Sequence, residues 1–387
     1  MTSVLFVSNG HGETAIADHI AAELRALAPE LEIDHLALVG DVRSQFARDV
    51  GPRKRMPSGG LIAMGNVGNL LRDLRAGLLA LTLSQWRLIR DARGYAAIVA
   101  VGDAFALWMA LRARAPVVYV GTAKSVHVAP YGRGEERLMR RARAVFVRDE
   151  ATAERLRTHG VAAQAPGNTI VDLFAEDRNP GFLAAAAGFE QIVAILPGSR
   201  GHAYDDAVFL LDVFADVARD APALGAVLSI APGIEPARIA NALRASGRVV
   251  RDTPHPSVPF EVLAGERPIA RAWSGGIGAL LHRSSLVLGQ AGTANEAAAA
   301  AGLPIIAFDR GIDREHAWYR RRQERLLGEA LVMLRDDRTL AATEVRAMLA
   351  DPQRRARLGA IGRERMGQPG GSRRIAERIA AIASEAH

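Results

Sequence analysis

Short apolar runs recur along this chain, and each is followed by a longer segment with the spacing of a helix. In the first half the runs are Ser3 to Val7, Ala96 to Val101, Pro116 to Val120 and Ala144 to Val147. In the second half they are Gln191 to Leu196, Ala226 to Ala231, Arg248 to Arg251, Ser285 to Gly289, Pro304 to Phe308 and Ala330 to Leu334. Strands that alternate with helices in this way predict an α/β protein, with parallel sheets covered by helices on both faces.

A break between the two halves is predicted at Asn179-Pro180-Gly181. We therefore expect an N-terminal doubly wound, Rossmann-like domain at residues 1–177 and a C-terminal one at residues 178–367. Residues 368–387 place Ile375, Ile379 and Ile382 along one helical face, so this helix is expected to pack back on the N-terminal domain and complete it. Two such domains would face a central cleft lined by the turns at the carboxyl ends of their strands.

Composition narrows this picture only slightly. The 387 residues are 49% hydrophobic, enough for two cores, and the absence of cysteine excludes disulfides and cysteine-bound metals. The net charge of +7 suits an anionic partner, but nearly all of it is arginine, so a biased composition explains it equally well. No secretory signal, membrane-spanning stretch or nucleic-acid motif is recognisable, so we expect a cytoplasmic protein, or one peripheral on the inner face of the cytoplasmic membrane.

The turn Pro197-Gly198-Ser199-Arg200 follows an apolar strand. Its glycine allows close backbone approach, its serine offers a hydroxyl, and its arginine can grip a phosphate through two hydrogen bonds. An ordinary turn with a surface arginine is the alternative. The turn therefore becomes informative only together with a second one.

That second turn opens the segment Leu286 to Phe308, which reads as strand, Gly-rich turn, helix and strand. Gly292-Thr293-Ala294 would begin the helix, and its free N–H groups would suit a pyrophosphate. Glu296 could accept hydrogen bonds from ribose hydroxyls, or could simply complement the positive end of the helix dipole.

The two turns in this order resemble the donor half of GT-B glycosyltransferases, specifically of lipid-A-disaccharide synthase. The segments Val101 to Gly121 and Pro166 to Phe174 resemble that family's aspartate-bearing loop and pre-hinge segment. The resemblance implies a GT-B fold, a UDP-linked nucleotide-sugar donor similar to UDP-N-acetylglucosamine, and a lipid-like acceptor. It implies no bound cofactor, and the chain has no Asp-x-Asp motif of the kind that carries a bridging metal.

Site residues are carried over by position. Ser199 and Arg200 would contact the donor phosphates, Glu296 the ribose, and Gly276 and Ile277 the base through their main chain. The full expected donor-binding set is Gly198, Ser199, Arg200, Gly276, Ile277, Gln290, Gly292, Thr293, Ala294 and Glu296.

The resemblance weakens on the acceptor side. The opening turn Asn9-Gly10-His11-Gly12-Glu13 differs from that of the synthase and is closer to the turn of the peptidoglycan N-acetylglucosaminyltransferase and of an uncharacterised synthase-related group. An aromatic-rich acceptor segment is replaced by Gly121 to Arg141. The chain is therefore expected to be a divergent relative, with Asn9, Gly10, Gly12, Glu13 and Lys124 near the sugar or acceptor.

Sugar transfer needs a base that removes the proton of the acceptor hydroxyl. Asp103 and His11 both follow strands and are the two candidates, with Asp103 slightly favoured because the resemblance is closer there. Asp103 could instead be a helix N-cap, and His11 could contact a ligand without transferring a proton. Glu13 is most simply interpreted as a carboxylate at a helix start.

The helix predicted at Asn69 to Arg90 has an unusual face, on which apolar side chains lie among arginines. Such a mixture suits an anionic membrane surface, whereas burial on both faces or a homodimer contact is the alternative. The residues of this face are Arg72, Arg75, Leu79, Leu83, Trp86 and Arg90.

Three other functions remain open. A UDP-N-acetylglucosamine 2-epimerase would use the same fold but no acceptor site. A nucleotide-sugar-binding protein without catalysis would keep only the donor site. A dinucleotide-dependent oxidoreductase is disfavoured because Ala15 occupies the third glycine position of Gly-x-Gly-x-x-Gly in the first turn.

Overall fold

The computed structural model describes residues 2–39, 43–54, 74–122, 124–174, 181–199, 202–311 and 314–385, without the side chains of His11 and of residues 314–316. The described chain divides into two compact units. Unit 1 is Met1–Leu173 together with Gly367–His387, and unit 2 is Phe174–Met366. The boundary expected at residues 177 and 178 falls outside the described residues.

Unit 1 is built on a parallel sheet with the strand order β3-β2-β1-β4-β5-β6-β7 among its described residues. The strands are β1 (Ser3–Ser8), β2 (Glu32–Ala37), β3 (Arg48–Asp49), β4 (Tyr95–Gly102), β5 (Val117–Gly121), β6 (Ala144–Val147) and β7 (Ala163–Gln164). The helices are α1 (His11–Leu27), α3 (Leu78–Asp91), α4 (Ala104–Ala110), α5 (Arg133–Met139), α6 (Glu150–Thr158), α7 (Thr169–Asp172) and α16 (Gly371–Glu385).

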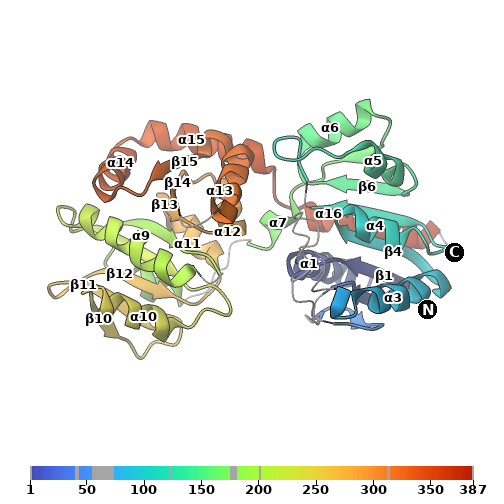
Figure 1. Cartoon of the computed structure of the whole chain (residues 1–387), viewed down its shortest axis with the longest axis horizontal. Coiled ribbons are helices and arrows are strands. Elements are labelled where there is room, and N and C mark those ends of the chain that lie inside the picture. Colours follow the sequence, from blue (N-terminus) through green and yellow to red (C-terminus); the bar gives the residue numbers. More distant parts are fainter. Residues whose placement is uncertain are drawn as a thin grey trace. The chain divides into compact units, whose positions relative to one another are not determined.

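The C-terminal helix α16 packs on α1, as the sequence predicts (Figure 1). Ile375, Ile379 and Ile382 are buried in the core that also holds Val4 and Ile20. An apolar stripe repeated every three to four residues is what a helix needs to cover one face of a sheet.

Unit 2 is built on a mixed sheet with the order β10-β11-β12-β9-β8-β13-β14-β15. Its strands are β8 (Gln191–Leu196), β9 (Leu224–Ser229), β10 (Val249–Asp252), β11 (Phe260–Ala264), β12 (Arg267–Trp273), β13 (Leu286–Gly289), β14 (Ile305–Asp309) and β15 (Leu331–Arg335). Its helices are α8 (Phe182–Ala186), α9 (Ala203–Ala218), α10 (Pro236–Ala245), α11 (Ile277–Arg283), α12 (Thr293–Ala301), α13 (Arg314–Leu327), α14 (Arg338–Ala350) and α15 (Pro352–Met366), with a 3-10 turn η2 (Gly328–Ala330).

One edge of this second sheet departs from the expected parallel order. The strands β10, β11 and β12 pair antiparallel, and only β12 rejoins the parallel part of the sheet through β9. A β-hairpin closes with a short turn, so these strands need no crossover helix between them. The parallel part of unit 2 therefore comprises β12, β9, β8, β13, β14 and β15.

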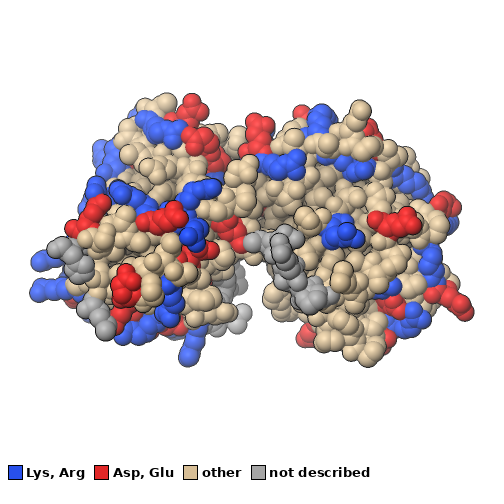
Figure 2. Space-filling model, turned by 180° about the vertical axis from the view of Figure 1, so that it is seen from behind, with Lys and Arg blue, Asp and Glu red and all other residues tan. Residues whose placement is uncertain are grey.

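Charged side chains are spread over both units. On the face shown in Figure 2, basic and acidic side chains are interspersed. The net charge of +7 is therefore not gathered into one basic patch on that face.

Candidate functional site

Each sheet has one point at which the chain changes the direction of its winding. In unit 1 the chain builds outward from β1 through β2 to β3, and then from β4 through β5 to β7, so this point lies between β1 and β4. In unit 2 it lies between β8 and β13. Ligands of doubly wound folds bind outside the carboxyl ends of the strands at this point, and the predicted turns of the sequence follow these four strands.

Asp103 is the N-cap of α4, which was the structural alternative for this residue. Its Oδ1 accepts hydrogen bonds from the main-chain N–H groups of Phe105 and Ala106, both at 3.0 Å. Its Oδ2 accepts a third from Asn9 Nδ2 at 2.9 Å. The carboxylate therefore joins the turn after β4 to the turn after β1 across the switch point of unit 1.

Glu13 occupies the space between the same two turns. A Cβ atom added to Gly10 would lie 2.7 Å from Glu13 Oε2, and one added to Gly102 would lie 2.7 Å from Glu13 Cγ. Both glycines have positive φ angles, 117° and 121°, where a side chain would be strained. The two glycines make room for the Glu13 side chain, which is half-buried.

The environment of Glu13 changes its chemistry. Burial raises the pKa of its carboxyl group above the usual value, its own main-chain N–H lowers this pKa, and the charge of Asp103 raises it further. A carboxyl group in an apolar setting beside a like charge is the arrangement that prepares an acid or base for use near neutral pH. Glu13 does lie in the first turn of α1, and the structure adds that its side chain is half-buried between two turns.

A chain of buried hydroxyl groups supports the first turn. Thr14 Oγ1 donates to the carbonyl of Gly10 at 2.8 Å, which uses its only proton. Ser8 Oγ, 2.9 Å from Thr14 Oγ1, must then be the donor to it, and His35 Nε2, 2.8 Å from Ser8 Oγ, must donate to the serine. His35 Nδ1 faces Asp49 Oδ1 at 3.5 Å, and burial lowers the pKa of the imidazole.

This network could not be predicted from the sequence, because Ser8, Thr14 and His35 belong to no recognisable motif. The only available signal was the polar pair Asp34-His35 inside an otherwise apolar stretch, where an unexplained polar residue indicates a buried partner. Ser8 is fully buried, so it supports the turn and is not exposed as a nucleophile.

The other residues expected on the sugar or acceptor side are less constrained. Lys124 Nζ forms an ion pair with Glu135 at 2.7 Å and lies 5.7 Å from the ring centre of Tyr131. Gly12 is exposed, and a Cβ added there would meet nothing within 4 Å. His11 is the first residue of α1, but its side chain is outside the described part of the chain.

In unit 2 the two predicted phosphate turns lie against each other. The main-chain N–H groups of Gln290 and Ala291 both donate to the carbonyl of Leu196, at 2.8 and 3.0 Å. A Cβ added to Gly198, whose φ is 103°, would lie 3.6 Å from Ala291 Cα. That distance leaves room for a Cβ, so it is the positive φ angle that favours glycine at this point of the turn.

The residues around this contact differ in exposure. Ser199 and Thr293 are exposed, and Gly292, Ala294 and Glu296 are half-buried. Arg200 lies outside the described residues. Gly292 is the N-cap of α12, and Thr293 is its first residue, so the main-chain N–H groups at this helix start lie directly beside the turn after β8.

Gln290 does not present its side chain to a ligand. Its amide is buried and pairs with the main chain of Phe308, donating at 3.0 Å and accepting at 3.2 Å. Gln290 can therefore contact the nucleotide-sugar donor only through its main chain. The side chain instead fastens the turn after β13 to β14.

The turn expected to hold the base is supported by a buried tryptophan. Trp273 Nε1 donates to the carbonyl of Gly276 at 2.8 Å, and Ile277 begins α11. A Cβ added to Gly275 would lie 2.1 Å from the Trp273 ring. The indole therefore fixes the main chain at Gly276 and Ile277, the two residues predicted to contact the base.

The predicted helix face on which apolar side chains lie among arginines is only partly as expected. Leu79 and Leu83 of α3 are 70% and 48% exposed, and Arg75 is exposed. Trp86, however, packs against the core of unit 1 with Arg90 over its ring at 4.7 Å, and Arg90 also pairs with Asp91 at 2.8 Å. Trp86 therefore does not belong to the exposed face, and Arg72 lies outside the described residues.

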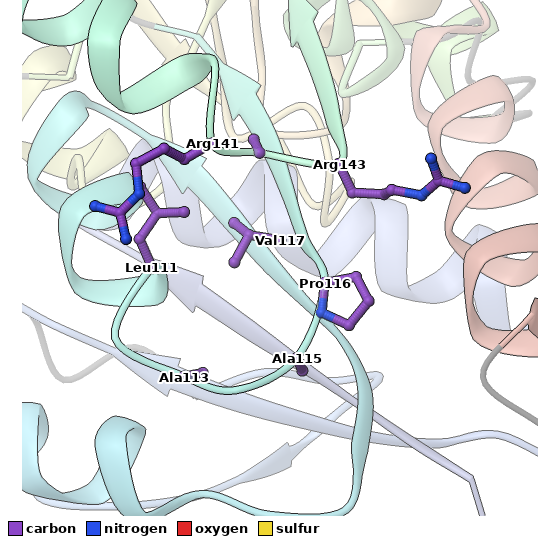
Figure 3. A pocket seen from close by; sticks show the side chains of 8 residues that line it. Leu111, Ala113, Ala115, Pro116, Val117, Arg141 and Arg143 are labelled. Carbon is purple, nitrogen blue, oxygen red and sulfur yellow. The ribbon is translucent and has the colours of Figure 1, made fainter.

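No described helix is both long and apolar enough to cross a bilayer. A surface hollow of unit 1 is lined by Leu111, Pro116, Val117, Arg141 and neighbouring residues. In Figure 3, Arg141 and Arg143 extend in different directions from the segment between α5 and β6. This hollow lies at the amino ends of β5 and β6, whereas Asp103 and Glu13 lie at the carboxyl ends of the strands of the same sheet.

Comparison with known proteins gives the fold. No protein-family model matches the chain, and no curated protein matches its sequence. The solved structure of UDP-GlcNAc 2-epimerase from Neisseria meningitidis, bound to UDP-GlcNAc, matches with a TM-score of 0.56 at 12% identity over 98% of this chain and 100% of that one.

Glycosyltransferases match equally well. MurG from Acinetobacter baumannii has a TM-score of 0.59 at 15% identity over 98% of this chain and 100% of that one. A UDP-glucosyltransferase from Polygonum tinctorium has a TM-score of 0.59 at 14% identity over 99% and 98%. The comparisons give no specific link to lipid-A-disaccharide synthase. The chain has the two-unit, Rossmann-like GT-B fold that these epimerases and glycosyltransferases share.

Proposed function

We propose that this protein is an enzyme that acts on a nucleotide sugar, with UDP as the nucleotide and an N-acetylglucosamine-like sugar. The observation that carries the proposal is the meeting of two glycine turns at the switch point of unit 2, where the N–H groups of Gln290 and Ala291 donate to the carbonyl of Leu196. The start of α12 offers N–H groups to an anion there. Two solved structures of the same fold are complexes with UDP and with UDP-GlcNAc.

In this proposal unit 2 binds the nucleotide. Ser199, Arg200 and the main-chain N–H groups of Gly292 to Ala294 contact the diphosphate, and Glu296 contacts the ribose. The main chain at Gly276 and Ile277 contacts the base. Backbone groups are suited to these roles because their positions are set by the fold and need no side-chain ordering on binding.

Unit 1 supplies the proton transfer. Asp103 and His11 were the sequence candidates, but three hydrogen bonds commit Asp103 to capping α4 and holding Asn9. Glu13, with its raised pKa, is better suited to accept a proton and later return it. We therefore assign the acid–base role to Glu13 and the positioning of its turn to Asp103.

Sugar transfer to a membrane lipid is the first candidate reaction. Its specific support is the exposed pair Leu79 and Leu83 on α3, together with the exposed Arg75 a few residues before this helix. Apolar side chains next to a cation bind the interface of an anionic bilayer. Under this reading the protein works at the inner face of the cytoplasmic membrane.

Epimerisation at C2 of the sugar is the second candidate, and the comparisons favour it over transfer. Four of the matching structures are named as UDP-N-acetylglucosamine 2-epimerases. Epimerisation removes a proton from carbon and returns it on the other face, which requires acid and base groups around the sugar. Glu13 is the acid–base group that we assign to this reaction, and Asp103 holds its turn in place.

One experiment separates these functions. The protein is incubated with UDP-N-acetylglucosamine, with and without bacterial membrane lipids, and followed by NMR. Formation of the manno epimer without lipid establishes epimerisation and contradicts transfer, whereas release of UDP only with lipid, together with labelled glycolipid, establishes transfer. Binding of UDP without any turnover indicates a nucleotide-sugar-binding protein.

The nucleotide is tested first, by thermal shift with UDP-, GDP-, TDP- and ADP-sugars. A ligand present at 100 times its Kd stabilises the native state by about 2.7 kcal/mol. We expect UDP-sugars alone to raise the melting temperature. If no nucleotide sugar at millimolar concentration does so, the assignment of unit 2 is wrong.

A further inference from the structure

Helix α13 holds the turn after β13 from the side of the protein interior. Gln323 Nε2 donates to the carbonyls of Ala291 and Gly292, at 2.9 and 3.0 Å. Arg320 Nη2 donates to the carbonyl of Gln290. Three consecutive carbonyl oxygens are therefore tied down by two side chains of one helix.

Because each peptide group is planar and trans, holding its carbonyl in place also fixes the direction in which its N–H points. The C=O of one residue and the N–H of the next point in opposite directions across a trans peptide. With the carbonyls of Ala291 and Gly292 directed at Gln323, the N–H groups of Gly292 and Thr293 must point away from it. Within the described residues these two N–H groups have no hydrogen-bond acceptor, so they remain available to a ligand.

The adjacent peptide supports the same geometry. The carbonyl of Gln290 faces Arg320, and the following N–H, that of Ala291, indeed points the other way, to the carbonyl of Leu196 at 3.0 Å. That contact is with the end of β8, next to the turn that carries Ser199. The N–H groups of Gly292 and Thr293 continue along the same side of the turn.

Charge adds to this arrangement. Arg320 and Gln323 are each only 4% exposed, so the guanidinium lies beneath the turn and out of water. A buried cation one peptide away from a row of N–H groups makes the turn more positive, because water screens it weakly. A diphosphate gains more from this than an uncharged ligand does.

We infer that Arg320 and Gln323 are positioning residues of the diphosphate site, which hold the turn 290–292 with its carbonyls inward and its N–H groups toward the phosphates. The inference rests on the proposed function, because it presumes a nucleotide diphosphate at that turn. Neither residue contacts the ligand, and neither belongs to the motifs by which the site was found.

The test compares UDP with uridine, which lacks the phosphates. Gln323→Leu and Arg320→Met are examined beside wild-type protein and beside Arg321→Met, a control on the exposed side of α13. UDP binding is measured by calorimetry and uridine binding by saturation-transfer NMR. We expect each of the two variants to weaken UDP about tenfold, the loss of one hydrogen bond's net energy, with uridine binding and the control unchanged.

The outcomes are distinct. If wild-type protein binds neither UDP nor uridine, the proposed function fails. If wild-type protein binds UDP and the folded variants bind it equally well, or lose UDP and uridine alike, the positioning role is wrong. If Gln323→Leu does not fold, Gln323→Glu keeps the side-chain size but removes the N–H donor. Arg320→Lys keeps the positive charge but loses the planar guanidinium group. Both variants still test the positioning role.

Discussion

Asn9 and Asp103 are joined by a hydrogen bond of 2.9 Å between Nδ2 and Oδ2, and this bond spans the switch point of unit 1. The two residues come from the turns after β1 and β4. The same carboxylate caps α4. One side chain thus fixes both the start of a helix and the distance between two turns.

Replacement of Asp103 separates capping from proton transfer. Asp103→Ala should lower the free energy of unfolding by about 1 kcal/mol, because two helix N–H groups lose their acceptor. Asp103→Asn keeps a capping oxygen and should leave stability within about 0.5 kcal/mol of wild type. Chemical denaturation measures both values.

Asp337 offers a matched control, since it caps α14 with two hydrogen bonds of 3.0 Å. Asp337→Ala should cost the same stability without affecting turnover. Because we assign proton transfer to Glu13, Asp103→Asn should retain most activity. A loss of a hundredfold or more in kcat with Asp103→Asn would return the base role to Asp103.

Glu13 should make the protein less stable as pH rises. Its folded-state pKa is raised, so its contribution to stability is fully present below the usual pKa and is lost as pH rises through the raised one. Glu13→Gln should therefore be more stable than wild type at pH 8 and about equally stable at pH 4. Denaturation curves at several pH values test this.

The same variant should lose activity, by about a hundredfold or more in kcat, because proton transfer by a positioned group contributes that much. Glu150→Gln, which removes an exposed carboxylate from the start of α6, should change neither activity nor the pH dependence of stability. Equal stability of Glu13→Gln and wild type at pH 8 would contradict the buried setting of Glu13.

His35 should make the protein sensitive to acid. Its pKa is lowered by burial, with Asp49 and Asp18 opposing this effect and Arg53 adding to it. A lowered pKa means that stability is present above the usual value near 6.5 and is lost as pH falls through the lowered one. Each proton that is taken up on unfolding lowers the free energy of unfolding by up to about 1.4 kcal/mol for each unit by which the pH falls.

His35→Gln keeps a donor for Ser8 but cannot titrate, so its stability should vary less between pH 7 and pH 5 than that of wild type. His282→Gln, on the exposed side of α11, is the control and should keep the wild-type slope. If the free energy of unfolding of both variants changes with pH as steeply as that of wild type, His35 is not neutral in the native protein.

Gly292 and Tyr319 provide a test by rescue. A Cβ added to Gly292 would lie 2.5 Å from the Tyr319 hydroxyl, whereas its φ of −87° suits any residue. Gly292→Ala should weaken UDP binding because the turn must shift. Tyr319→Phe removes the clashing oxygen, so the double variant should bind UDP more tightly than Gly292→Ala alone, as calorimetry would measure. Equal affinities would mean that the hydroxyl is not the obstacle.

The fold could be predicted from the sequence where strands are apolar throughout. β1, β4, β8 and β13 are buried and pair parallel with their neighbours, and their runs of aliphatic residues are plain in the sequence. β2 was not predicted, because it contains Asp34 and His35, whose burial depends on partners such as Tyr95, 2.6 Å from Asp34 Oδ2, that lie elsewhere in the chain.

The site divides in the same way. The turns could be predicted because glycines and polar residues follow the strands directly, and ligands bind at those ends. The setting of Glu13 could not be predicted, since it depends on Gly102 in another turn. Nor could the clamp by Arg320 and Gln323, because their exposed neighbours in α13 make the segment read as a solvated, arginine-rich helix.

The return of α16 to unit 1 has a consequence for synthesis. Asp172 accepts hydrogen bonds from the N–H groups of Gly370 and Ser372, at 2.5 and 2.7 Å, and Ile375 and Ile379 complete the core beneath α1. Unit 2 is one uninterrupted stretch of chain, so a ribosome delivers all of it before the last piece of unit 1. Unit 1 therefore cannot complete its core when its first stretch is made, and its apolar surface beside α1 stays open until α16 emerges.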